Sequence, residues 1–166
     1  MARKLSPEMA GLVHFIDALN LGFIKKYFGE VPENFAVPSI YYPVPERTSG
    51  GFSTESYSAE YAVYLKIFAA DSLSSDGLAE DVMDGIMSAG RNIPTYDTDG
   101  KQDGHWFHVY NVEARNIEMG VTQIYLTYKV QRGYYEEPAT PVVVFHYAGL
   151  PTNIEEDSQN EQQTEE

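Results

Sequence analysis

Cysteine is absent from this sequence of 166 residues. The absence excludes disulfide bonds, thiolate metal ligands and a cysteine nucleophile, and it leaves the redox compartment open. Uncharged apolar runs of about 18 residues are also missing, so we expect no membrane-spanning helix. An apolar stretch near the N-terminus follows Arg3 and Lys4, but Glu8 and Asp17 interrupt it. We therefore expect no signal peptide, and the cytoplasm is the default location.

Basic residues are scarce, with 11 Lys and Arg against 25 Asp and Glu, which gives a net charge of −14. A groove that grips nucleic acid phosphates needs clustered basic side chains, so this composition argues against one. The acidic balance suits a soluble protein, or a surface that DNA passes without sticking. Residues 151–166 contain six acids and no Lys or Arg. We expect a single domain over residues 1–150, followed by an acidic, disordered tail.

Two apolar stripes at helical spacing predict two helices. The first begins at Ser6, which is placed to cap the helix before Pro7, and we expect it to end at Gly29. The second is predicted from Ser74 to Ala89, with Gly90 ending it. The stripes consist of Leu5, Met9, Leu12, Ile16, Leu19, Phe23 and Tyr27 in the first helix, and Leu78, Val82, Ile86 and Ala89 in the second.

Alternating apolar and polar residues predict a strand over residues 57–68. A hairpin follows, with strands over residues 106–115 and 124–130 and a turn at 118–120. Before the first strand lie a proline-rich segment, expected to be an edge strand or an extended connection, and a Gly/Ser/Thr-rich segment over residues 46–56, expected to be a mobile loop. A last apolar run from Val142 to Tyr147 can add an edge strand. The expected fold is α+β, with two helices packed on one face of a mixed, mainly antiparallel sheet.

No group of residues matches a catalytic, cofactor-binding or metal-binding pattern. The segment from Asp97 to Gly104 superficially suggests a calcium loop, but its glycine falls at position four and His108 stands at position twelve, so the pattern fails. His105 and His108 are three apart on a predicted strand and would point to opposite faces. We therefore expect no metal, no cofactor and no enzymatic activity.

The 13 tyrosines are the unusual feature of the composition. Several lie on strand faces that the predicted core does not claim, or in proline-rich connections. Tyrosine is enriched at protein interfaces because it joins a large apolar ring to a polar tip. Ordinary half-buried sheet aromatics are an equally good explanation. The interface candidates are Tyr41, Tyr42, Tyr64, Tyr125, Tyr134 and Tyr135.

The order of the predicted elements resembles that of the tail terminator, or tail completion, proteins of long-tailed bacteriophages. The likeness covers roughly residues 5–135. The segments that carry it are LAEDVMDGI at residues 78–86, Ile93-Pro94, DTDG at 97–100, VEAR at 112–115 and GVTQIYLTY at 120–128.

This resemblance implies a structural virion protein that is assembled in the host cytoplasm. It would form a homo-hexameric ring on the tail tube, stop tube polymerisation and join the tail to the head connector protein. DNA would pass through the lumen of the ring without specific binding, and the family has no catalytic residues to transfer. Two alternatives stay open: an aromatic-rich glycan- or ligand-binding module, and another neck or tail completion protein.

Overall fold

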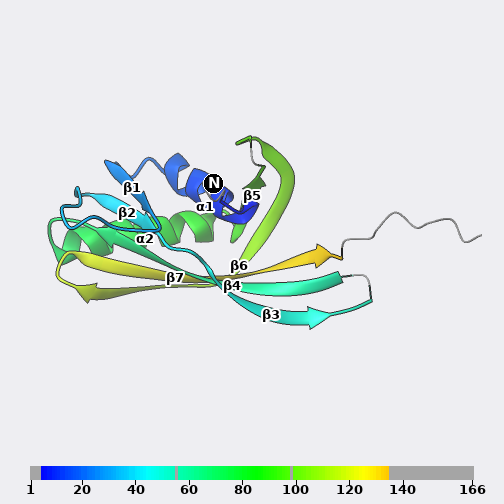
Figure 1. Cartoon of the computed structure of the whole chain (residues 1–166). Helices are drawn as coiled ribbons and strands as arrows, with labels where there is room; N and C mark the ends of the chain where they lie inside the picture. The colour runs from blue at the N-terminus through cyan, green and yellow to red at the C-terminus, as the bar shows by residue number, and fades with distance from the viewer. Residues whose placement is uncertain (1–4, 55, 98, 135–166) are drawn as a thin grey trace, which may run out of the picture. The chain divides into compact units, whose positions relative to one another are not determined.

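The computed structural model of the chain describes residues 5–54, 56–97 and 99–134. Within them, two helices and a mixed, curled sheet give the expected α+β class (Figure 1). The elements follow one another as α1 (Pro7–Ala18), β1 (Lys25–Phe28), β2 (Ser39–Tyr42), β3 (Glu46–Phe52), β4 (Ser56–Phe68), α2 (Ser72–Ser88), β5 (Asn92–Tyr96), β6 (Gln102–Glu118) and β7 (Val121–Gly133).

The strands are ordered β1-β2-β4-β7-β6-β5, and β3 pairs with β4 off this path. β1 and β2 are parallel, whereas the other pairs are antiparallel, as predicted for a mixed, mainly antiparallel sheet. β2 and β3 share one edge of β4: β2 pairs with residues 66–68 and β3 with residues 57–62. β3, β4 and β7 therefore form a three-stranded arm that extends away from β1 and β2 (Figure 1).

The long antiparallel pair β4–β7 is the centre of the sheet and confirms the predicted alternation. Val63, Leu65 and Ile67 are fully buried on β4, and Ile124 and Leu126 are fully buried on β7. These side chains share one face because successive residues of a strand point to opposite sides. We refer to this face as the helix face and to the opposite one as the outer face.

The two helices contact different parts of the sheet. α2 packs on β6, β7 and β4, and its buried side chains include Ala79, Val82 and Ile86. α1 lies chiefly against β5, where Gly11 comes so close that a Cβ atom on it would stand 2.1 Å from the carbonyl oxygen of Pro94. The sheet reaches α1 because the first half of β6, paired with β5, curls toward that helix (Figure 1).

The first helix is shorter than the sequence predicts. Ser6 caps its start as expected, accepting a hydrogen bond from the backbone N–H of Met9, but the helix ends at Ala18 rather than at Gly29. Asn20 then adopts a left-handed φ of 56° and Gly22 one of 76°, conformations that end a helix. Phe23 therefore lies outside the helix, and Tyr27 belongs to β1. The apolar spacing continues past the true end because Tyr27, which is partly buried, belongs to β1.

The segment predicted as a mobile loop is mostly strand β3, which is a second correction. Its residues pair with β4 from Glu46, opposite Ala62, to Phe52, opposite Tyr57. Glycine fits at position 50 because β4 comes close there: a Cβ on Gly50 would lie 2.4 Å from the hydroxyl oxygen of Ser58. Likewise β2 is not an edge strand, because β1 pairs with its other side.

Other boundaries agree more closely with the sequence. α2 begins two residues before the predicted Ser74, with Asp71 as its cap, and Ala89 is exposed rather than buried. The hairpin turn falls at Met119-Gly120, where Gly120 has a positive φ of 74°. β5 was not predicted. The expected strand at residues 142–147, the tail at 151–166 and the domain end at 150 lie outside the described residues.

Candidate functional site

The outer face of the β4–β7 pair carries two tyrosines side by side. Tyr64 stands opposite Tyr125 in the strand register, and their rings stack with centroids 5.0 Å apart and planes inclined by 30°. Both are half-buried, on the face opposite the core, as the sequence predicts. Loss of water around the ring, together with the nearby Glu46 carboxylate and Tyr125, raises the pKa of the Tyr64 hydroxyl above 10.0.

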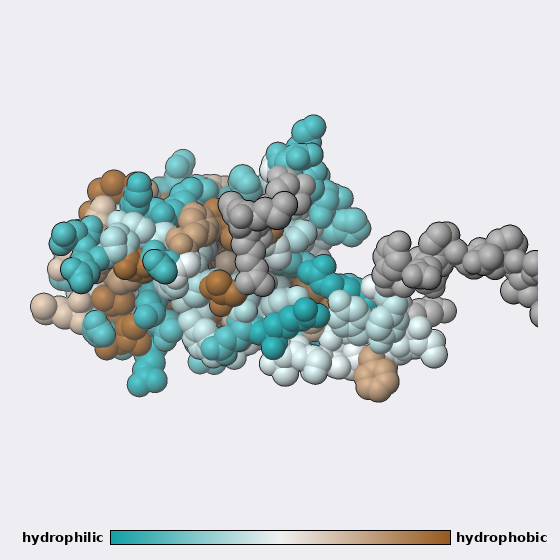
Figure 2. Space-filling model, viewed as in Figure 1, coloured by the Kyte–Doolittle hydropathy of each residue, from teal (hydrophilic) through white to brown (hydrophobic). Residues whose placement is uncertain are grey.

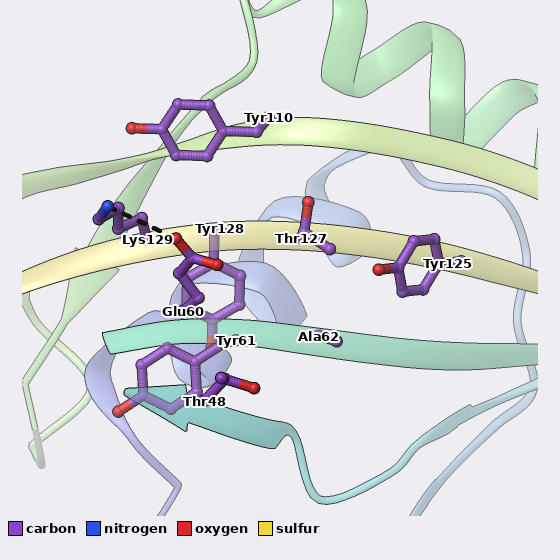
Figure 3. Close-up of a pocket in the computed structure, with 9 residues that line it drawn as sticks. All are labelled: Thr48, Glu60, Tyr61, Ala62, Tyr110, Tyr125, Thr127, Tyr128 and Lys129. Atoms are coloured by element: carbon purple, nitrogen blue, oxygen red, sulfur yellow. Dashed lines mark ion pairs between the residues drawn. The ribbon is translucent and has the colours of Figure 1, made fainter. Parts of the chain in front are cut away.

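Next to this pair the outer face is hollowed. The hollow has a volume of about 420 Å³, in the size range of small-molecule sites. Figure 3 shows Ala62 and Thr127, which are small, between larger side chains of β4, β6 and β7. The lining residues are Thr48, Glu60, Tyr61, Ala62, Tyr110, Tyr125, Thr127, Tyr128 and Lys129.

Charged groups surround the hollow. Lys129 forms an ion pair with Glu60, with 3.4 Å between Nζ and Oε1 (Figure 3). Glu46 is the register partner of Ala62 on β3, and Glu113 is the register partner of Tyr125 on β6. The side-chain amide of Asn111 donates a hydrogen bond of 2.7 Å to Glu113 Oε1. Among the lining residues Glu60 and Lys129 balance each other in charge, and the flanking carboxylates of Glu46 and Glu113 add negative charge beside the hollow.

The remaining interface candidates differ in exposure. Tyr42 is only 2% exposed and belongs to the core, where burial raises the pKa of its hydroxyl, so the structure removes it from the list of surface anchors. Tyr41 is half-buried and its hydroxyl donates to the carbonyl oxygen of Gly29 at 2.8 Å. Tyr134 is 44% exposed and its ring lies 5.5 Å from that of Tyr57. Tyr135 lies outside the described residues.

A second aromatic group was missed by sequence reasoning. The guanidinium carbon of Arg47 lies 5.9 Å from the ring centroids of both Tyr57 and Tyr61. Tyr61 in turn stacks on the buried Tyr128, with centroids 5.1 Å apart. The signal that could have found this group is the alternation Tyr57, Ala59, Tyr61, which puts both rings on one face of the strand, four residues apart. Without the β3 assignment, Arg47 could not be placed beside them.

The segment rejected as a calcium loop forms a turn. Asp97 accepts hydrogen bonds of 2.9 Å from the backbone N–H groups of Asp99 and Lys101. Asp103 accepts a hydrogen bond from the Thr95 hydroxyl, which is the first cause that lowers the pKa of its carboxyl group. His108 points to Asn92, with 3.0 Å between Nδ1 and Oδ1. Among the residues that the structure describes, no three His, Asp or Glu side chains are grouped to hold a metal ion.

The surface around these sites is mixed in character. In the space-filling view, hydrophobic side chains gather toward the end formed by β1, β2 and the β6–β7 turn, whereas hydrophilic and intermediate ones cover most of the arm (Figure 2).

Trp106 and Tyr110, both on β6, are 60% and 56% exposed. Within residues 5–54, 56–97 and 99–134, neither helix is long and apolar enough to span a membrane.

Comparisons with known proteins point to bacteriophage. The chain is 26% identical to the phage-like element PBSX protein XkdJ of Bacillus subtilis (strain 168) over 117 residues, which is 70% of this chain and 80% of that protein. It is also 26% identical over 92 residues to the uncharacterized protein YqbJ of the same strain, covering 55% of this chain and 63% of that protein. No protein-family model matches the chain. The protein is therefore phage-related.

Proposed function

We propose that this protein is a structural component of a phage tail, a tail terminator that forms a homo-hexameric ring on the end of the tail tube. In this role it stops tube polymerisation and joins the tail to the head connector protein. DNA passes through the lumen of the ring without being bound specifically. The protein resides in the virion and performs no catalysis.

One observation carries the proposal: similarity to a protein of a phage-like element extends over 70% of the chain. The aligned length leaves out less than a third of the chain, so it includes most of the α+β body rather than one motif. The layout of the sequence, which resembles that of tail terminators, supplies the specific assignment. The packing of both helices on one face of the mixed sheet, which the sequence pattern predicts, remains part of the proposal.

The surface chemistry supports an assembly role. A ring needs two complementary patches on each subunit, because the same contact repeats around the rotation axis. The stacked pair of Tyr64 and Tyr125 is a suitable anchor, since half-buried tyrosines contribute strongly to interfaces. Helix α2 carries Asp76, Glu80, Asp81 and Asp84 and no basic residue, which suits a protein past which DNA must slide.

The decisive experiment is an assembly assay. The purified protein is mixed with its cognate tail-tube protein and followed by negative-stain imaging and by mass measurement. We expect rings of six subunits on tube ends, and tubes of limited length. Tubes that grow equally long with and without the protein, or a protein that stays monomeric beside them, would refute the proposal.

The hollow on the outer face favours a second candidate function, a ligand-binding module. Tyr110, Tyr125 and Glu60 supply aromatic and polar groups of the kind that hold glycans. A glycan array separates this function from the first. A module of this kind binds a sugar as a monomer and has no effect on tube length.

A further inference from the structure

The hollow on the outer face is built by the strand register. Ala62 and Thr127 face each other on β4 and β7 and form its floor. One step along the same face, the Tyr64–Tyr125 pair borders the hollow, and one step in the other direction the Glu60–Lys129 pair borders it. Two small side chains thus lie between two rows of large ones, which leaves a depression wide enough to admit a long side chain.

Aromatic rings form part of its wall. Tyr110 and Tyr125 approach from β6 and β7, and the Tyr125 hydroxyl points toward the middle of the hollow (Figure 3). Tyr110 reaches this position at an irregularity of the β6–β7 register between Val109 and Asn111, where the strand carries an extra residue. A cation placed beside such rings is attracted by the negative potential of their faces.

The charges favour a cation. Glu60 and Lys129 are the charged residues of the lining, and the carboxylates of Glu46 and Glu113 lie beside the lining residues Ala62 and Tyr125. The Arg91 guanidinium also reaches this region, but it is engaged with the backbone carbonyl oxygen of Tyr110. Lys129 and Glu60 are both substantially exposed, at 40% and 58% of the side chain. An exposed ion pair of this kind contributes only about 0–1 kcal/mol, so an incoming cation can replace Lys129 as the partner of Glu60.

We propose that this hollow binds an arginine side chain of a partner protein. A guanidinium group is planar, so it can stack on a tyrosine ring while donating paired hydrogen bonds to a carboxylate, which an ammonium group cannot do. The flanking carboxylates of Glu46 and Glu113 disfavour an anionic occupant such as a phosphate or an acidic peptide segment. The inference goes beyond the proposed function and requires only the folded subunit, because every residue of the hollow belongs to one chain.

The test uses the full-length protein and the peptide acetyl-Gly-Arg-Gly-amide, followed by NMR titration of the labelled backbone. We expect saturable shifts at the amides of residues 60–62 and 125–129. The same peptide with citrulline in place of arginine keeps the shape but loses the charge, and it should bind at least about fivefold more weakly. Equal binding of the two peptides would overturn the proposal, as would the absence of saturation.

Variants locate the site. Ala62→Leu fills the floor and should abolish the shifts, and Glu60→Gln should weaken binding several-fold without altering the shape of the hollow. Gln123→Leu, on the same face of β7 but four residues from Thr127, is the control and should bind normally. Unchanged binding by Ala62→Leu would place the peptide elsewhere and refute the site. If the tube-capping assay fails while arginine binding is normal, the proposed function is wrong and this inference stands.

Discussion

Arg132 on β7 donates a hydrogen bond of 2.8 Å from Nη2 to Oε1 of Glu8 on α1. The Glu8 side chain is only 6% exposed, and among the residues that the structure describes Arg132 is the cation that pairs with it. The two residues stand 124 positions apart in the sequence, and the pair fastens the start of α1 to the end of β7.

We expect Arg132→Met to destabilise the fold by roughly 1.5–3 kcal/mol, because it leaves a buried carboxylate without its cation. The partial exposure of Arg132 favours the lower end of that range. Replacing both residues, with Glu8→Leu and Arg132→Met, should recover most of the loss, since no charge is then buried. Urea unfolding of the wild type, both single variants and the double variant measures the coupling. A double variant less stable than Arg132→Met would contradict this account.

Two helical glycines should respond oppositely to the same substitution. Gly11→Ala places a Cβ 2.1 Å from the Pro94 carbonyl oxygen, and neither backbone can move without separating α1 from β5. We expect a loss of about 1–3 kcal/mol, the usual cost of overpacking. Gly77→Ala in α2 meets nothing within 4 Å and should stabilise the fold by roughly 0.5–1 kcal/mol. Thermal melts of the two variants and the wild type measure these changes in stability. If Gly11→Ala is as stable as the wild type, α1 and β5 do not approach as closely as described.

The capping residue of α2 predicts a pH-dependent effect. Asp71 accepts hydrogen bonds of 2.8 Å from the backbone N–H and from the hydroxyl of Ser74, and these bonds lower the pKa of its carboxyl group below 3.8. A lowered folded-state pKa stabilises the fold above the unfolded value and loses that effect as the pH falls through the folded value. Asp71→Asn should therefore melt below the wild type at pH 7.

The difference between the two melting temperatures should shrink as the pH falls below about 4. Asp76→Asn, one turn further along α2, is the matched control and should show a smaller difference at pH 7. A difference between Asp71→Asn and the wild type that stays constant from pH 7 to pH 3 would show that the charge of Asp71 is not what caps the helix.

The sequence predicts the parts of the fold that depend on local periodicity. The β4 alternation, the β6–β7 hairpin and most of α2 follow from side-chain spacing, and Ser6-Pro7 marks the start of α1. The end of α1 was missed because Leu19, Phe23 and Tyr27 continue the helical spacing into a strand. Nothing in that spacing reveals that Asn20 adopts a positive φ. Its conformation depends on the path of the chain from α1 to β1, which is a tertiary feature.

Long-range pairing explains the other failures. β3 has the composition of a loop, and only its close contact with β4 at Gly50 and Ser58 makes that composition suitable for a strand. The sequence predicts one part of the Tyr64–Tyr125 arrangement, since alternation places each ring on the outer face. That the two rings lie opposite each other follows only from the register of the β4–β7 pair. Tyr42 was misplaced because the proline-rich segment hides which side of β2 faces the core.

The last prediction tests the assembly role through these two tyrosines. Tyr64→Ala with Tyr125→Ala removes both stacked rings from the outer face, while the buried neighbours Val63 and Leu126 keep the core intact. We expect a folded subunit with native circular dichroism. Truncating an interface anchor costs more than about 1 kcal/mol per residue, so the variant should cap tail tubes weakly and the tubes should overgrow.

The control is Lys66→Ala, which removes a long side chain from the same face, next to Tyr64 on β4. It should cap tubes like the wild type, because substitutions of surface residues that are not anchors stay within about 0.5 kcal/mol. Negative-stain measurement of tube lengths, at equal concentrations of the three proteins, gives the comparison. If the tyrosine variant unfolds, the rings belong to the core of the subunit. If it folds and caps normally, the outer face is not the surface that meets the tube or the neighbouring subunit, and assembly must depend on another face of the molecule.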